Sequence, residues 1–221
     1  MFDYTATPKG ARMQEQQDPK QRIMRIAADL FSCRGYGLVG VREIAQKANV
    51  NISMISYYFN GKMGILRAII ESFFENYFEI IKANYDPALP PEDSLKKLIK
   101  AIIEFMRENR EEALVMFSQL HIDEPEIREL KVQKVQKMFT FFHGLIRQFG
   151  VDPAQRRQQV AIFGPALIST LFSTFLLQPI AKGIFKIEYD DKFYDEYVNL
   201  ISLYVLDGIH GVQRYMNERE A

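Results

Sequence analysis

The feature that most constrains the fold is the spacing of apolar residues, which repeats with the period of an α-helix in almost every window. Within residues 19–33, for example, one stripe recurs at intervals of three and four, formed by Ile23, Ile26, Ala27, Leu30 and Phe31. Such spacing places side chains on one face of a helix, whereas a half-buried strand alternates every second residue. No alternation of that kind persists over more than a few residues, so the sequence predicts an all-α protein.

Glycine, proline and asparagine divide this pattern into separate helices. Gly35 and Gly37 are expected to stop the first helix, Asn49 to take the left-handed conformation of a tight reversal, and Asn51 to cap the third helix. We expect helices over 19–33, 41–48, a short stretch after Asn51, 62–84, 92–109, 111–121, 125–149, 153–182 and 191–217.

Three short helices, the second and third joined by a three-residue turn, predict an N-terminal helix-turn-helix domain over residues 19–62. A larger helical domain for ligand binding and dimerisation is expected over 63–221. Residues 1–18 mix Gln, Pro, Gly, Lys and Asp without apolar spacing, and they predict a disordered arm.

Charge is distributed unevenly between these parts. The 28 basic and 28 acidic residues cancel over the whole chain. Residues 20–67 nevertheless hold eight basic and two acidic side chains, a local net charge of +6. This excess predicts that the N-terminal part meets a polyanion such as double-stranded DNA, and a merely solvated basic face is the alternative.

The third helix has two different faces. At 100° per residue, Ile55, Tyr58 and Phe59 fall on one side and are expected to pack inward. Small and hydrogen-bonding side chains fall on the other, as close approach to base edges and phosphates requires. The candidate DNA-binding residues, for which plain surface is the alternative, are Arg42, Asn51, Ser53, Met54, Ser56, Tyr57 and Lys62.

The run from Ile23 to Leu66 resembles the DNA-binding domain of the TetR family of transcriptional regulators. The residues that carry the resemblance are Ala27-Ala28-Asp29-Leu30-Phe31, Gly35-Tyr36, Val41-Arg42-Glu43-Ile44-Ala45, Val50, Tyr58-Phe59, Lys62 and Leu66. The resemblance implies an all-helical dimeric regulator whose divergent C-terminal domain binds a small effector. The chain departs from the family pattern at Gly40, Asn49 and Ser56, where Thr or Ser, Gly and Tyr are usual, and each lost contact is expected to weaken DNA binding modestly.

The last two helices predict a homodimer. Neither can bury its apolar stripe alone, and pairing with a symmetry mate in a four-helix bundle would cover both. A two-fold dimer matches a palindromic operator. The candidate interface residues are Ser169, Ser173, Tyr197, Ile201, Tyr204 and Gly208.

Aromatic residues of the middle helices predict a pocket for an apolar or aromatic effector, with core packing as the alternative. The candidate lining residues are Phe105, Phe117, His121, Phe139, Phe142, His143, Phe172 and Phe175.

The predicted function is a dimeric, cytoplasmic transcriptional regulator, acting as a repressor that a small effector releases from palindromic DNA. No cofactor, metal or membrane partner is expected. A helix-turn-helix protein without an effector stays open as an alternative, and an all-α enzyme has little support because no catalytic or metal-binding constellation is present. The uncharged stretch 160–181 is long enough to cross a bilayer, but Gly164, Pro165 and Pro179 favour a helix covered by protein.

Overall fold

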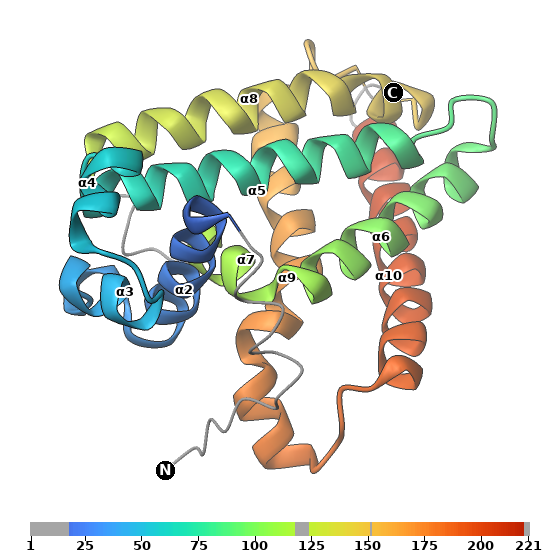
Figure 1. Cartoon of the computed structure of the whole chain (residues 1–221). Helices are drawn as coiled ribbons and strands as arrows, with labels where there is room; N and C mark the ends of the chain where they lie inside the picture. The colour runs from blue at the N-terminus through green and yellow to red at the C-terminus, as the bar shows by residue number, and fades with distance from the viewer. Residues whose placement is uncertain (1–17, 118–123, 151, 219–221) are drawn as a thin grey trace. The chain divides into compact units, whose positions relative to one another are not determined.

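The computed structural model describes residues 18–117, 124–150 and 152–218, and none of these residues forms a β-strand (Figure 1). The described residues form nine α-helices and one 3-10 turn, which confirms the all-α prediction. They are α2 (Pro19–Arg34), η1 (Tyr36–Leu38), α3 (Val41–Lys47), α4 (Ile52–Phe59), α5 (Lys62–Asn84), α6 (Pro91–Glu108), α7 (Arg110–Phe117), α8 (Pro125–Gln148), α9 (Arg157–Phe185) and α10 (Asp191–Glu218).

Most helices begin and end within a few residues of their predicted bounds. The largest difference is α9, which begins at Arg157 instead of 153 and ends at Phe185 instead of 182. The turn η1 was not predicted. Of the predicted arm, only Asp18 lies within the described residues, where its side chain accepts a 3.3 Å hydrogen bond from the amide of Lys20 and caps α2.

The described residues divide into two compact units. The first comprises the residues up to Phe73 together with Glu111–Leu130, and the second comprises Phe74–Arg110 with the residues from Lys131 onward. Helix α7 therefore packs with the N-terminal helices, although nothing in its sequence signalled this.

Apolar stripes on short helices build the core of the first unit. Ile23, Ile44, Ile55 and Ile65, one each from α2, α3, α4 and α5, are almost completely buried. Gly64 makes the junction between α4 and α5 possible, because a Cβ atom at this position would overlap the carbonyl oxygen of Phe59. The first unit is thus a small bundle in which α3 and α4 are held on α2 and α5.

In the second unit, α6 and α10 lie side by side (Figure 1). Arg107 of α6 pairs with Asp191 of α10 at 2.6 Å, and its guanidinium lies 4.5 Å from the centroid of the Tyr194 ring. On α6 the buried face includes Leu98, Ile99, Ile102, Ile103 and Phe105.

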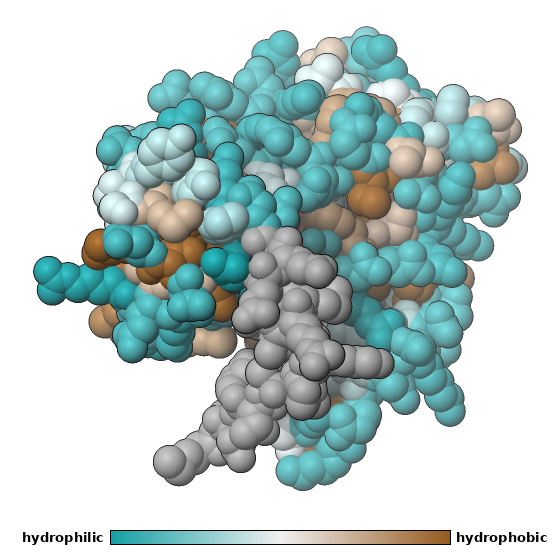
Figure 2. Space-filling model, in the orientation of Figure 1, coloured by the Kyte–Doolittle hydropathy of each residue, from teal (hydrophilic) through white to brown (hydrophobic). Residues whose placement is uncertain are grey.

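Helix α9 is poorly covered by its own chain. Within the described residues it is the helix that could cross a membrane by length and composition, and only 11% of its most apolar 18-residue window is buried. A single helix of this kind is weak support for a membrane protein, since helices of soluble proteins pass the same test. Most of the surface seen in Figure 2 is hydrophilic, with apolar residues in small patches.

Candidate nucleic-acid interface

The turn between α3 and α4 has the geometry of a tight helical reversal. Asn49 has a φ of 50°, which confirms the predicted left-handed conformation. Its amide donates to the carbonyl of Gln46 at 3.1 Å, and the amide of Val50 donates to that of Ala45 at 3.0 Å. These bonds satisfy carbonyl groups that the end of α3 would otherwise leave free, and they fix where α4 begins.

Helix α4 buries one face and exposes the other, as predicted. Ile55 and Phe59 are only 1% and 6% exposed. Tyr58 is half-buried, while Ser53 and Ser56 are exposed. Because both exposed serines are small, this face allows another molecule to approach the helix backbone closely.

Among the described residues of this unit, Tyr57 has the most exposed aromatic side chain, at 83%. Its ring packs edge-on against Tyr58, with 5.0 Å between the centroids. Met54, also predicted on this face, is half-buried. Tyr57 therefore projects its hydroxyl outward from a partly fixed ring.

Asn51 caps α4, as predicted. Its side-chain oxygen accepts from the amide of Ser53 at 2.9 Å and from the hydroxyl of the same residue at 2.8 Å. Both side chains were also predicted to contact DNA. In the structure Asn51 and Ser53 form these two hydrogen bonds with each other, and the contact of both side chains with DNA stays a prediction.

The basic side chains near this face differ in their partners. Glu43 pairs with Arg34 at 2.6 Å and with Lys47 at 3.6 Å, so both cations are partly neutralised. Arg42 is exposed and has no partner among the described residues. It is therefore well placed to meet an external anion.

Lys62 is half-buried, and its contacts differ from those predicted. The ammonium donates to the backbone carbonyls of Tyr36 at 2.9 Å and Val39 at 3.0 Å, and it lies 4.2 Å from the centroid of the Tyr36 ring. The predicted phosphate contact stays untested, but this cation already has partners within its own chain.

The predicted dimer residues are only partly exposed in the single chain. Ser169 and Tyr204 are exposed, and Ser173, Ile201 and Gly208 are half-buried. Tyr197 differs from the prediction, since its hydroxyl donates to the carbonyl of Leu171 at 3.0 Å and its side chain is buried in its own chain.

Larger apolar side chains that the prediction left out are exposed on the same two helices. On α9 and α10 they include Ile162, Leu176, Leu177, Ile180, Ile184, Phe185, Leu200 and Leu203, all at least 50% exposed. For the side chains of α9, the signal that could have identified them was the uncharged stretch 160–181.

The predicted pocket residues belong to several packing clusters. In the first unit Phe117 meets Phe73, with 6.5 Å between ring centroids. In the second unit three of them contact other aromatic rings: Phe105 meets Tyr77, Phe142 meets Phe141, and Phe175 stacks on Tyr194. Phe139 lies close to Gly164. Phe172 is buried, and His143 is half-buried. His121 lies outside the described residues.

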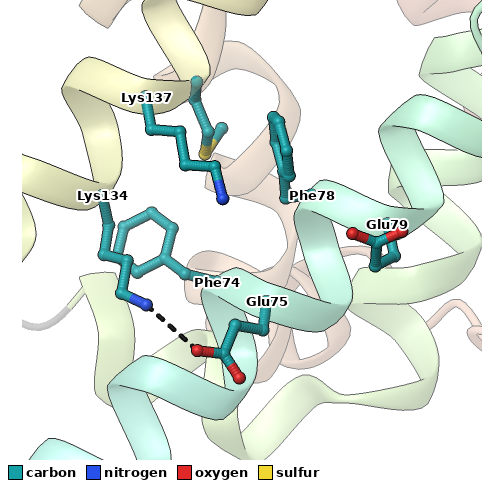
Figure 3. A pocket seen from close by; sticks show the side chains of 7 residues that line it. Phe74, Glu75, Phe78, Glu79, Lys134 and Lys137 are labelled. Atoms are coloured by element: carbon teal, nitrogen blue, oxygen red, sulfur yellow. Dashed lines mark hydrogen bonds and ion pairs between the residues drawn. The ribbon is translucent and has the colours of Figure 1, made fainter.

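One hollow in the second unit lies between α5 and α8 and is lined by none of these predicted residues (Figure 3). Phe74 and Phe78 form its apolar wall, and Lys134 pairs with Glu75 at 3.2 Å across it. Among the described residues, no group of three or more His, Cys, Asp or Glu side chains could hold a metal ion.

A buried three-helix core, a fixed turn and an exposed polar face on α4 together define a helix-turn-helix DNA-binding protein. The sequence model described as "Bacterial regulatory proteins, tetR family" matches residues 23–69. Residues 23–69 of the chain thus match the DNA-binding domain of the TetR family of transcriptional regulators.

Full-length comparisons agree with this assignment. The chain is 26% identical over 193 residues to the "probable HTH-type transcriptional regulator YttP" of Bacillus subtilis, covering 84% of this chain and 91% of that protein. Its fold is similar to that of a TetR-like regulator from Rhodococcus sp. RHA1, with a TM-score of 0.65 and 19% identity over 87% of this chain and 96% of that one. It is also similar to that of the fatty acid degradation regulator FadR from Bacillus halodurans, with a TM-score of 0.67 and 18% identity over 87% of this chain and 97% of that one. At these identities the solved structures show the fold alone.

Proposed function

We propose that the chain works as a homodimeric repressor that places α4 of each subunit in one of two neighbouring major grooves of a palindromic operator. In this proposal residues 19–62 bind DNA, and residues 63–221 dimerise and bind an effector. The observation that carries it is the division of α4 into a buried face around Ile55 and an exposed face around Ser53 and Ser56.

The candidate DNA-binding side chains of α3 and α4 differ in length. Ser53 and Ser56 are short enough to let α4 approach base edges, and together with Met54 they are assigned to sequence discrimination. Tyr57 and Arg42 extend further and are assigned to phosphate oxygens, which fix the register of the protein on the duplex. The unpaired charge of Arg42 supports its assignment.

Dimerisation is assigned to α9 and α10. Ile162, Ile180 and Ile184 recur near one line along α9 and are each at least 60% exposed in the single chain. Removing such apolar surface from water contributes about 25 cal/mol per Å². A second copy offers an equivalent surface, so a two-fold four-helix contact would cover both helices.

Effector response is assigned to the larger domain. Helix α5 begins in the first unit and ends in the second, so it connects the part that binds DNA to the part that would bind an effector. An apolar effector would shift the population towards an arrangement that no longer fits two successive grooves. The fatty acid regulator among the structural neighbours makes acyl chains the first compounds to try.

The decisive experiment selects binding duplexes from bacterial genomic DNA and then measures affinity, salt dependence and stoichiometry by mobility shift and sedimentation. Two chains per palindromic duplex, with affinity that falls as salt rises, are expected. A monomer without salt-sensitive affinity for any duplex would refute the proposal.

A thermal-shift screen of fatty acids and other apolar compounds tests the effector separately. Stabilisation together with release of the selected duplex supports an effector. Normal DNA binding without any stabilising compound would favour a regulator that lacks one.

A further inference from the structure

Lys62, the first residue of α5, reaches back across the chain to the connection between α2 and α3. Two of its ammonium protons are directed to the carbonyls of Tyr36 and Val39, at 2.9 and 3.0 Å. The positive charge lies over the Tyr36 ring, 4.2 Å from its centroid. Because an ammonium has three donors in all, most of the capacity of this cation is used within the first unit.

We propose that Lys62 is a positioning residue for DNA binding: it ties residues 36–39 to the start of α5 and so fixes the entry to α3, in place of contacting a phosphate. A second contact supports the same connection. The hydroxyl of Tyr36 donates to the Sδ atom of Met63 at 3.9 Å, so Tyr36 is held by two consecutive residues of α5.

The entry to α3 needs such a tie because its N-cap cannot supply one. Gly40 occupies the N-cap with extended φ and ψ of −99° and 150°, and no side chain bonds to the first turn. A Ser or Thr there would fix the turn with its hydroxyl, whereas glycine leaves the backbone freer. Val39, whose carbonyl Lys62 holds, directly precedes Gly40 and is 1% exposed.

The consequence for DNA binding follows from Arg42, which lies in the first turn of α3. If the entry to α3 moves, the exposed guanidinium of Arg42 moves with it, and so does α4, which packs on α3. This inference rests on the DNA-binding face proposed above.

The test compares Lys62→Met and Tyr36→Leu with Arg42→Met in the full chain. Each variant is titrated with the duplex that the unmodified protein selects and with a scrambled duplex of equal length, over a range of salt concentrations. Arg42→Met is expected to flatten the slope of log Kd against log salt by about 1, as the loss of one phosphate contact does. Lys62→Met and Tyr36→Leu are expected to keep the slope and to lose roughly tenfold affinity for the selected duplex, as one lost charged hydrogen bond would predict.

A slope that flattens by about 1 in Lys62→Met would overturn the proposal, because it identifies a phosphate contact. Full affinity of Tyr36→Leu for the selected duplex would also overturn it. Tyr36→Leu keeps the Lys62 cation, so it remains informative if Lys62→Met does not fold.

A second measurement does not depend on DNA. Gly40→Ser has room for its side chain, since a Cβ atom there meets nothing within 4 Å. If Lys62 replaces a cap, Gly40→Ser should raise the melting temperature more in the Lys62→Met background than in the unmodified chain. Equal gains in the two backgrounds would contradict the proposal. If the unmodified protein bound no duplex, the proposed function would fail while this comparison would still decide the role of Lys62.

Discussion

The Nε atom of Arg22 donates a 2.7 Å hydrogen bond to the carbonyl oxygen of Ala48, 26 residues further along the chain. Ala48 is the C-cap of α3, so this bond satisfies one of the carbonyls that a helix end leaves free. It ties the reversal before α4 to the first helix of the bundle. The orientation of the exposed face of α4 therefore depends on a side chain of α2.

Arg22→Met should destabilise the first unit by about 2 kcal/mol, because a part-buried charged hydrogen bond is lost and the Ala48 carbonyl is left without this donor. Urea unfolding followed by circular dichroism measures the change. Lys20→Met is the matched control, since it removes the same charge from an exposed position on the same helix. Equal stabilities of the two variants would show that the bond to Ala48 is unimportant.

Gly64→Ala should cost about 3 kcal/mol or more, because the new methyl group overlaps the Phe59 carbonyl and forces α4 and α5 apart. Gly37→Ala is the control, since a Cβ atom at Gly37 meets nothing within 4 Å. Thermal unfolding of both variants tests this. A Gly64→Ala protein as stable as the control would mean that the junction can relax.

Tyr57→Ala and Ile55→Ala should separate DNA binding from stability. Tyr57 is 83% exposed, so its truncation should leave unfolding almost unchanged while weakening DNA binding roughly tenfold, the loss of one good contact. Ile55 is 1% exposed, so its truncation should cost about 2–5 kcal/mol of stability. Parallel mobility-shift and denaturation measurements check both, and the assignment of faces would fail if the two variants exchanged these effects.

Ile180→Glu should convert a dimer to monomers, because it places a charge in the middle of the proposed apolar contact. Val132→Glu on α8 makes the same chemical change at a comparable exposure, 59% against 60%, outside that contact. Sedimentation at several protein concentrations distinguishes them. The same oligomeric state for both variants would remove α9 from the interface.

Glu112→Gln should stabilise the chain near neutral pH, with an advantage that disappears in acid. Burial raises the pKa of Glu112 above its ordinary value of 4.5, and neighbouring Glu111 and Asp29 add to the rise. The folded chain then binds the proton more tightly than the unfolded one, so the contribution of Glu112 is favourable below about pH 4.5 and is lost as pH rises through the raised pKa.

Chemical denaturation of Glu112→Gln between pH 4 and pH 8 tests this pH dependence, at about half-unit steps. Glu196→Gln, an exposed change on α10, is the control and should follow the unmodified chain. A constant difference between Glu112→Gln and the unmodified chain at every pH would rule out titration of Glu112 as the cause.

Local spacing was sufficient to predict the helices and the faces of α4. The period that separates Ile55 and Phe59 from Ser53 and Ser56 is a property of the eight consecutive residues of α4. The left-handed turn at Asn49 likewise depends on the local sequence. These features need no knowledge of distant parts of the chain.

Contacts between distant segments could not be predicted in this way. From the sequence alone, Lys62 has the charge and position of a phosphate-binding residue. Only the fold shows that the carbonyls of Tyr36 and Val39, 26 and 23 residues earlier in the chain, lie within hydrogen-bonding distance of its ammonium. Tyr197 belongs to the same stripe as the exposed residues of α10, yet its hydroxyl bonds to the Leu171 carbonyl of α9. Periodicity identifies an apolar face but does not say which neighbour covers each side chain.

The solvent exposure of α9 has a consequence for how regulation depends on the concentration of the protein. If the chain dimerises through α9 as proposed, scarce protein stays monomeric because pairing follows the square of the concentration, and the exposed apolar surface of this 29-residue helix is left in water. Occupancy of a palindrome is then expected to switch on over a narrow range of expression. The rate at which the cell synthesises and degrades this protein would set the onset of regulation alongside any small molecule.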